Sequence, residues 1–519
     1  WLNVSARVKL DRDNTHNERK MYASTLTVLS ENSDKGAYIE TEQNTTQYYV
    51  DAMVNVNKYF YNDIWNITAV MGISMLDLNY RGLNFGGGLL TVPNFFSPNN
   101  VDVAGKLTYR RQNYHDRTNS LFGTASLGYK GMAYLEGSLR NDWLSALAGT
   151  DHKSILYPSI GVSAILTNIF KVNPNYLSYA KVRFSYSEVG NAPTRFSAIT
   201  TYSVYGGLST TSYFPMKDLK PERTHSWEAG LNLAFFNNKL TLDATLYKSY
   251  TKNQLFNPSI STTTGYSSMY INSGKVSNKG IELALGYKQK IGTVDWNTTL
   301  LWSLNRNKID QLLPEYTNED LGVTVRLDEM DVYSLGGAKQ RLTIGGAMGD
   351  LYANTLRTDD HGHIWVNSRT KRVEGDKNNY IYVGNTNPKY TLSWRNNIHW
   401  KGFNLGFMIN ARVGGVGVSG TQAVMDYYGV SKASAKARDN GGVLVNGNKL
   451  DAQSWYQTVG GNGVDFIGGC YIYNMTNVRL GEVTLGYDIP INKWCNFIKG
   501  LNVSFVGRNL WMLYCKAPF

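Results

Sequence analysis

The stretch WEAGLNLAFFNNKLTLDATLYK, residues 227–248, alternates apolar and polar side chains on both sides of a central Asn-Asn pair. Such alternation places one set of side chains on each face of a β-strand, and Asn-Asn between two runs is typical of a hairpin turn. The stretch therefore predicts a hairpin with one apolar and one polar face. Its apolar positions are Trp227, Ala229, Leu231, Leu233 and Phe235, then Leu240, Leu242, Ala244 and Leu246.

The same alternation recurs from one end of the chain to the other. With the two runs above, it predicts about sixteen strands of roughly ten residues, the length that a tilted strand needs to cross a bilayer. No run reaches the roughly 18 consecutive apolar residues of a spanning helix, which argues against a helical membrane protein. The further runs are 2–10, 20–29, 46–58, 63–75, 119–129, 132–143, 157–167, 179–189, 281–288, 296–304, 389–399, 402–412, 475–487 and 501–510.

The predicted connections alternate between short and long. Short turns on one side and long loops on the other are typical of an outer-membrane barrel, whereas a soluble β-sandwich offers no reason for this asymmetry. We therefore expect an all-β fold, a transmembrane antiparallel β-barrel whose apolar face contacts lipid and whose polar face lines a lumen. The long connections are predicted at 76–118, 190–224, 251–276, 307–388 and 413–474, and the short ones at 130–131, 236–239, 290–295 and 400–402.

Single tryptophans stand near several predicted strand ends. An amphipathic ring suits the headgroup level of a membrane, but the same ring also serves in ordinary packing, so both interpretations stay open. The residues concerned are Trp143, Trp227, Trp394 and Trp400.

The charge distribution and the short motifs argue against nucleic-acid binding, metal binding and catalysis. The 519-residue chain carries a net charge of +12, but its Lys and Arg are scattered instead of forming a basic helix or patch, so nucleic acid is not an expected partner. Cys470, Cys495 and Cys515 lack both CxxC spacing and neighbouring His. Residues 358–362 are interpreted as an acidic turn, and residues 86–88 as a flexible glycine segment. We expect neither catalytic residues nor a metal or other cofactor, and hence no enzyme.

The long predicted loop at 413–474 is rich in aromatic and amide side chains. Aromatic faces with amide donors suit sugar rings or peptide backbones, so this loop holds the candidate substrate-binding residues. Packing within the loop itself is the alternative for each of them. The candidates are Tyr427, Tyr428, Trp455, Tyr456 and Gln457.

Eight short motifs follow one another between residues 138 and 514: SLRNDW (138–143), YPSIGVS (157–163), KVRFSYSEVGN (181–191), LKPERTHSWEAGL (219–231), INSGKVSNKGIEL (271–283), YVGNTNPKYTLS (382–393), VRLGEVTLGYDIP (478–490) and VGRNLWMLY (506–514). In this order they resemble the SusC/RagA family of TonB-dependent outer-membrane transporters.

The resemblance implies a barrel of about 22 strands closed by an N-terminal plug. It also implies a SusD-like surface lipoprotein as a lid, the TonB complex as the energy source acting through the plug, and an oligosaccharide or peptide as the imported ligand. Assembly as a dimer of transporter–lipoprotein pairs is compatible with it. On this basis residues 1–519 are expected to be one partial barrel domain in the outer membrane, without the plug, the first strands and the closing strand. An open sheet edge in lipid would leave backbone groups unpaired, which also calls for further strands.

Two other functions are compatible with the alternation alone. A surface barrel or adhesion scaffold that transports nothing would show the same strand pattern. An outer-membrane enzyme is disfavoured because no nucleophile, general base or metal cluster emerges from the sequence.

Overall fold

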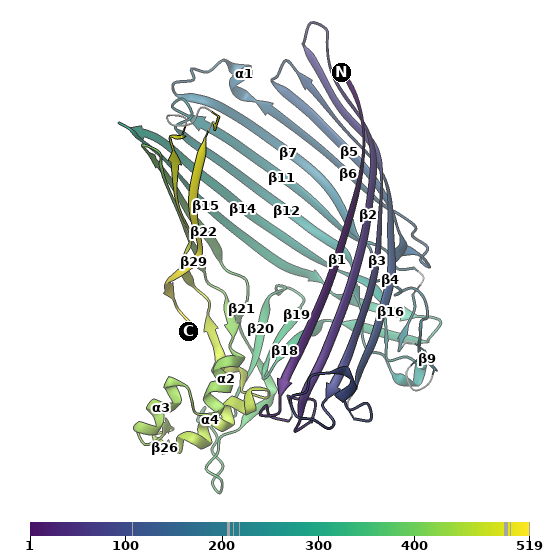
Figure 1. The fold of residues 1–519 in the computed structure, drawn as a ribbon, viewed down its shortest axis with the longest axis vertical. Coiled ribbons are helices and arrows are strands. Elements are labelled where there is room, and N and C mark those ends of the chain that lie inside the picture. The colour runs from purple at the N-terminus through teal and green to yellow at the C-terminus, as the bar shows by residue number, and fades with distance from the viewer. Residues whose placement is uncertain are drawn as a thin grey trace.

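The computed structural model describes residues 1–27, 29–105, 107–204, 208–210, 212–216, 218–491, 497–498 and 500–517. Fifteen antiparallel strands pair in chain order into one sheet, which curls into an incomplete barrel with β1 and β29 at its two edges (Figure 1). The strands are β1 (Leu2–Tyr22), β2 (Gly36–Phe60), β3 (Trp65–Gly88), β4 (Thr108–Tyr129), β5 (Ala133–Leu144), β6 (Ile155–Ile165), β7 (Leu177–Asn191), β11 (Glu222–Phe235), β12 (Leu240–Phe256), β14 (Ile271–Ile291), β15 (Val294–Gln311), β22 (Tyr390–Trp400), β23 (Phe403–Val413), β28 (Asn477–Ile489) and β29 (Leu501–Cys515).

The all-β barrel fold is confirmed, and one predicted strand is wrong. The run at 20–29 does not form a strand of its own, because the β1–β2 ladder closes at the pair Tyr22↔Gly36. The chain then turns, with Glu31 and Asn32 in the left-handed region at φ 54° and 65°. The other fifteen predicted runs each overlap one strand of the sheet.

The first four strands are longer than the expected ten residues, at 21, 25, 24 and 22 residues. The loop predicted at 76–118 is therefore only 89–107, because both flanking strands continue with polar sequence. The segment 86–88 is not a flexible loop either, since it ends β3. At Gly86 (φ 152°) a Cβ atom would lie 2.2 Å from the carbonyl oxygen of Tyr38, so the strands approach too closely there for any side chain.

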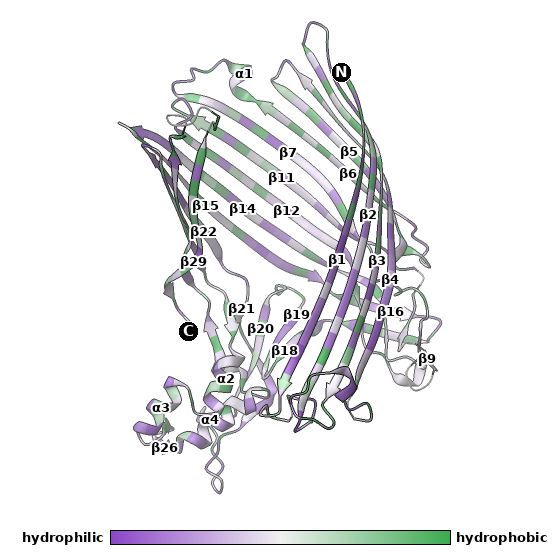
Figure 2. Cartoon of the chain, viewed as in Figure 1, coloured by the Kyte–Doolittle hydropathy of each residue, from purple (hydrophilic) through white to green (hydrophobic). Residues whose placement is uncertain are grey.

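Hydrophilic and hydrophobic residues are interspersed along the strands (Figure 2). Because successive residues of a strand point to opposite faces, this pattern gives the sheet two different faces. From β1 to β7 the register runs without a shift, so one parity of residues stays on one face. On the outward face Leu135, Val162 and Phe184 are direct cross-strand neighbours, and each is about half exposed, at 48%, 49% and 50%. Exposed apolar side chains in contiguous rows are typical of a lipid-facing band.

Aromatic residues flank this band at both ends. Trp65 packs on Tyr129 at 4.8 Å between ring centroids, and Phe403 packs on Tyr487 at 4.6 Å, both at the end with the short turns. Trp400 lies at that end too, as the last residue of β22, whereas Trp143, next to last in β5, lies on the side of the long loops. Trp227 lies inside β11 and not at a strand end. Trp394 is at mid-strand, so it does not lie at a strand end.

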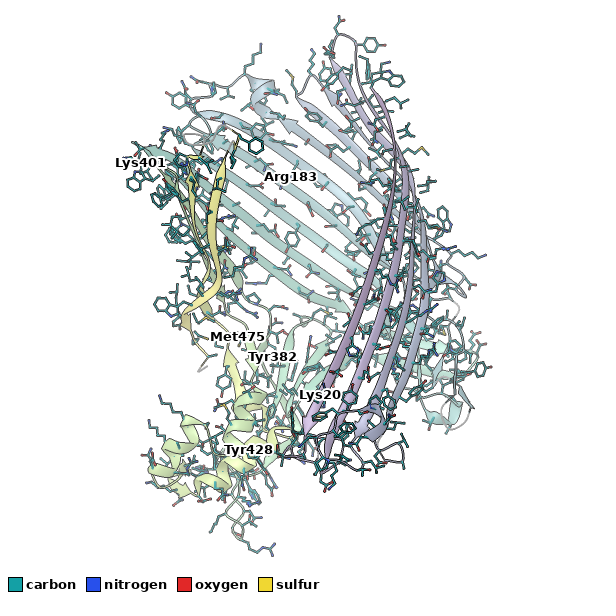
Figure 3. All side chains as sticks on the ribbon, viewed as in Figure 1. Lys20, Arg183, Tyr382, Lys401, Tyr428 and Met475 are labelled. Atoms are coloured by element: carbon teal, nitrogen blue, oxygen red, sulfur yellow. The ribbon has the colours of Figure 1, made fainter. Side chains whose placement is uncertain are left out.

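The long connections gather at one end of the sheet, together with Lys20 and Tyr428, while Lys401 marks the end with short turns (Figures 1 and 3). Residues 312–389 and 414–476 fold together there into what we call the loop unit. Within the described ranges, no helix is long and apolar enough to cross a membrane. The helices are α1 (Leu166–Phe170), α2 (Gly420–Tyr427), α3 (Lys432–Asp439) and α4 (Ala452–Gly460). The small strands are β8 (Tyr202–Val204), β9 (Leu208–Thr210), β10 (Tyr213–Phe214), β13 (Ser268–Met269), β16 (Leu313–Asn318), β17 (Val323–Leu327), β18 (Glu329–Leu335), β19 (Ala338–Thr343), β20 (Asp350–Leu356), β21 (Gly375–Asn385), β24 (Val416–Val418), β25 (Val443–Val445), β26 (Asn448–Leu450) and β27 (Ile472–Asn474).

Candidate functional site

The inward face of the sheet carries paired charges. Arg7 binds Asp51 at 2.9 Å, and the Arg140 guanidinium donates both to Asp142 at 2.7 Å and to the Ser120 hydroxyl at 2.8 Å. All of these residues share the parity opposite to the lipid-facing rows. A wall of satisfied polar groups is what a water-filled or plugged lumen requires.

The largest of these networks is centred on Arg183 of β7 (Figure 3). Its guanidinium donates to Asn232 at 2.6 Å and to Asp243 at 3.3 Å, and Asn232 in turn donates to Asp243. A cavity of about 480 Å³ adjoins the network, bounded on its far side by residues that include Glu282 and Ser303. The network cross-links three neighbouring strands and presents both charge signs to the lumen.

A stack of aromatic and cationic side chains lies on the same inward face, nearer the long loops. Tyr80 of β3 and Tyr114 of β4 are stacked at 4.6 Å, and the Arg195 guanidinium lies 3.9 Å from the Tyr114 ring centre. Arg195 is held by two bonds to Asp116, at 2.8 and 2.5 Å. We call Tyr80, Tyr114 and Arg195 the mouth stack. Its planar surfaces suit a sugar ring or a peptide group.

Sequence reasoning missed the mouth stack, because its members come from two strands and a separate loop. Only the cross-strand pair Tyr80↔Tyr114 brings the two rings together. Each Tyr taken alone reads as an ordinary strand residue, so no local signal could have identified the group.

The loop unit has a hydrophobic core of its own. Its two segments cross at Gly337 and Gly468, where a Cβ on Gly468 would lie 2.3 Å from the Gly337 carbonyl oxygen. Asn354 accepts from the Gly468 N–H at 2.8 Å, which ties the two segments together at this crossing. The buried core consists of Val373, Ala423, Val445, Leu450, Val459, Phe466, Ile467 and Tyr471.

One polar pair is buried inside this unit. The Tyr471 hydroxyl donates to Asp426 Oδ2 at 3.1 Å. The Gln422 side-chain amide donates to Oδ1 of the same carboxylate at 2.9 Å. Burial, together with the Asp426 charge, raises the pKa of Tyr471 above its ordinary value. The hydroxyl therefore keeps its proton and remains a donor.

The structure separates the five predicted substrate-binding residues. Trp455 and Tyr456 pack against the core of the loop unit, and Gln457 is half-buried on the same helix, α4. Tyr427 and Tyr428 form an edge-to-face pair at 5.1 Å, and Tyr428 is 59% exposed. Tyr428 is thus the one of the five with a largely free ring.

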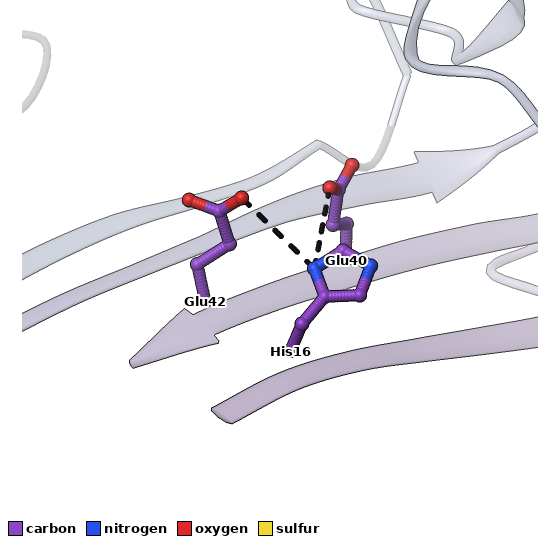
Figure 4. A group of neighbouring side chains, drawn as sticks. All are labelled: His16, Glu40 and Glu42. Carbon is purple, nitrogen blue, oxygen red and sulfur yellow. Dashed lines mark ion pairs between the residues drawn. The ribbon is translucent and has the colours of Figure 1, made fainter. Parts of the chain in front are cut away.

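His16, Glu40 and Glu42 form a cluster on β1 and β2 (Figure 4). Their ligand atoms lie within 4.8 Å of one another, a donor set that could hold a divalent cation. His16 Nδ1 lies 3.8 Å from a Glu40 carboxylate oxygen and 3.9 Å from one of Glu42.

Residues 2–510 match the family described as "TonB dependent receptor-like, beta-barrel". TonB-dependent receptor P3 of Formosa agariphila is 25% identical over 492 residues, which cover 86% of this chain and 46% of that protein. TonB-dependent receptor SusC of Bacteroides thetaiotaomicron is 24% identical, over 85% of this chain and 45% of its own length. The chain thus spans about half the length of these relatives.

Among solved structures, the RagAB peptide importer in its open-open state superposes with a TM-score of 0.75. The match covers 99% of this chain and 56% of that chain at 18% identity, so it concerns the fold. A receptor and transport family of this kind is not an enzyme family. The resemblance to SusC and RagA is confirmed, and the chain belongs to the TonB-dependent receptor-like β-barrel family of outer-membrane proteins.

Proposed function

We propose that this chain forms the barrel wall of an importer that takes up an oligosaccharide or a peptide across the outer membrane. In this proposal a SusD-like surface lipoprotein closes the mouth, and the TonB complex supplies energy through a plug. The names of the relatives support the dependence on TonB, and RagAB is itself described as a peptide importer. The paired charges on the inward wall support a lumen that accepts polar cargo.

The observation that carries the proposal is the loop unit at the long-loop end of the sheet. A loop of this size is usually functional, and this one is folded around a buried core while exposing apolar side chains. Val430 and Leu444 are 70% and 69% exposed. Exposed apolar side chains on a rigid platform are typical of a surface that a partner protein covers.

In this proposal two groups contact the ligand. The mouth stack presents the Tyr80 and Tyr114 rings on the inward face, and Tyr428 presents a free ring on the loop unit. A ligand held between a lid and these rings would be enclosed before it enters the barrel. Selection would then occur at this enclosure, without the ring of charged side chains that selects ions in an open channel. Trp455, Tyr456 and Gln457 would then act by shaping the loop unit.

The test is an uptake assay with a labelled oligosaccharide set and a labelled peptide set, in cells with and without TonB. We expect uptake of one class to be abolished without TonB while surface binding persists. Uptake that continues without TonB and rises linearly with external ligand would instead indicate a passive pore.

The lid is tested separately, by co-purification in mild detergent. The double variant Val430→Asp/Leu444→Asp should lower the amount of co-purified lipoprotein about tenfold, because buried apolar anchors dominate interface energies. Val103→Asp is the matched control, since Val103 is 66% exposed on a different loop. Equal losses in both variants would count against the loop unit as the docking surface.

A further inference from the structure

Three neighbouring strands present a row of cations on the outward face of the sheet, beside a Trp on a fourth strand. Trp227 of β11 lies opposite Lys248 of β12, which lies opposite Lys279 of β14, which lies opposite Arg306 of β15. We call Lys248, Lys279 and Arg306 the cation row. Its side chains have the same parity as the apolar outward residues of these strands.

The cation row borders the lipid-facing band directly. The next row toward the short turns is Ala229, Leu246, Ile281 and Leu304, so every position two residues along each strand is apolar. Leu246 is 55% exposed, as expected of a side chain that faces acyl chains. The row is the first polar row beyond the apolar rows on the side of the long loops, although β12, β14 and β15 continue past it. This position at the border of the apolar band suits contact with outer-leaflet headgroups.

These cations are not neutralised by the protein. Within the described ranges, Lys248 and Lys279 make neither an ion pair nor a hydrogen bond. Arg306 donates to two backbone carbonyl oxygens, of Lys389 at 2.9 Å and of Asn305 at 3.2 Å, which leaves its charge unpaired. Like charges directly opposite each other destabilise a sheet, so three adjacent cations call for an anion from outside.

The inward face shows the opposite arrangement. There Arg7, Arg140 and Arg183 each bind an Asp of this chain within 3.3 Å. These three inward guanidinium groups are thus paired with carboxylates of the chain, whereas the three cations of the cation row are not.

A cavity of about 440 Å³ lies at the cation row. Trp227 and Tyr250 form its aromatic side, with the Lys275 ammonium 5.0 Å from the Tyr250 ring centre. Five cations and a single carboxylate line it, and that carboxylate, Asp310, is 3.9 Å from Lys308. The cavity therefore combines a strong positive charge with an amphipathic ring of the kind found at headgroup level.

We propose that the cation row binds the phosphate group of a lipid in the outer leaflet. Lys and Arg donors form charge-assisted hydrogen bonds to phosphate oxygens. The acyl chains of the same lipid would lie along Leu246 and Ile281. A soluble phosphate would meet the same donors, but it would gain nothing from the adjacent apolar rows, which is why we assign the site to a lipid.

The test uses the protein purified in detergent and native mass spectrometry. Monophosphorylated lipid A, the same lipid without its phosphate, and inorganic phosphate serve as probes. The triple variant Lys248→Gln/Lys279→Gln/Arg306→Gln should bind the phosphorylated lipid about a hundredfold more weakly, since each cation near an anionic membrane surface contributes roughly fivefold. Lys130→Gln/Lys239→Gln/Lys401→Gln is the control, because it removes the same charge from exposed lysines at the short turns.

The outcomes are distinct. Loss of binding in the cation-row variant alone, and weak binding of the dephosphorylated lipid by the parent, would support the site. Equal binding by both triple variants would overturn it, and so would inorganic phosphate binding as tightly as the lipid. A cation-row variant that keeps the lipid but loses an acidic partner protein would assign the row to that protein instead. If the triple variant does not assemble, Lys279→Gln alone should still weaken lipid binding about fivefold.

Discussion

The wall of β1–β4 and the loop unit both rise beyond the lipid-facing band, but by different means. In the first, the strands simply continue: the row Asn14, Asn44, Arg81 and Asn113 is polar throughout and still pairs across four strands. In the second, β22 and β23 stop after 11 residues each, and the chain between the strands folds around Phe466 and its neighbours.

The difference shows two ways to order a chain outside the membrane: through backbone hydrogen bonds between strands, or through a hydrophobic core. A continued ladder bonds the N–H and C=O groups that face a neighbouring strand, so its side chains need not form a core. A loop without that ladder must bury apolar side chains to offset the entropy of ordering it. The first region should therefore tolerate side-chain changes that the second does not.

The largest effect on stability is expected for Phe466→Ala in the loop unit. Phe466 is fully buried, at 0% exposure, and removing a buried phenyl ring lowers the free energy of unfolding by about 3–5 kcal/mol. Hydrogen exchange should show loss of protection across the loop unit while β1–β4 stay protected. Val464→Ala, at a residue 66% exposed, is the control. Unchanged protection in Phe466→Ala would mean that the loop unit is held by something other than its core.

The next effect concerns the band from which both regions rise. Leu231→Arg or Leu242→Arg should hinder membrane assembly, because both side chains face lipid. An Arg near mid-bilayer makes the free energy of barrel assembly less favourable by roughly 2–4 kcal/mol. Thr241→Arg should be tolerated, since Thr241 faces the lumen beside Gly286. Asn232 also faces the lumen, but it binds Arg183 and Asp243 and is a poorer control.

Heat-modifiable migration on a denaturing gel measures assembly in these variants. Equal damage at lipid-facing and lumen-facing positions would show that both faces are packed, as in a soluble sandwich.

A smaller effect is expected for Tyr471→Phe. The variant keeps the ring in the core but removes one hydrogen-bond donor to the buried Asp426. This loss should lower the stability of the loop unit by about 1–3 kcal/mol. Local exchange in α2 and α4 is the measurement. Tyr428→Phe, at an exposed ring, should leave exchange unchanged, and a comparable loss there would argue against a specific role for the Asp426 bond.

The smallest effect is a pH dependence of the β18–β19 hairpin. Burial alone would raise the pKa of Asp331, but hydrogen bonds from Arg341 and Lys339 outweigh it and lower that pKa. The pair thus stabilises the hairpin above the ordinary Asp pKa of about 3.9, and this contribution is lost as the pH falls through the lowered value. It should stay under about 1 kcal/mol because the site is partly exposed.

Exchange of the hairpin amides between about pH 5 and pH 2 checks this expectation. Asp331→Asn should abolish the acid-dependent step, and persistence of the step in that variant would assign it to another carboxylate.

Much of the candidate site lay beyond prediction from the sequence. The loop at 413–474 was identified by its length and aromatic content, and Tyr428 is exposed there as a ligand contact requires. Nothing local distinguished it from Trp455 and Tyr456, which pack inward. The mouth stack gave no signal at all, because Arg195 reaches Tyr114 only once the long loop after β7 has folded back.

The sequence by itself determined which face each strand residue occupies, since alternation is a property of the extended backbone and needs no partner strand. It could not determine where a ladder ends, as the run at 20–29 and the long polar ends of β3 and β4 show. The tertiary structure alone decided that Lys248, Lys279 and Arg306 stand side by side and that Gly337 crosses Gly468. Such contacts depend on strand register and loop packing, whose energies exist only after distant segments have met.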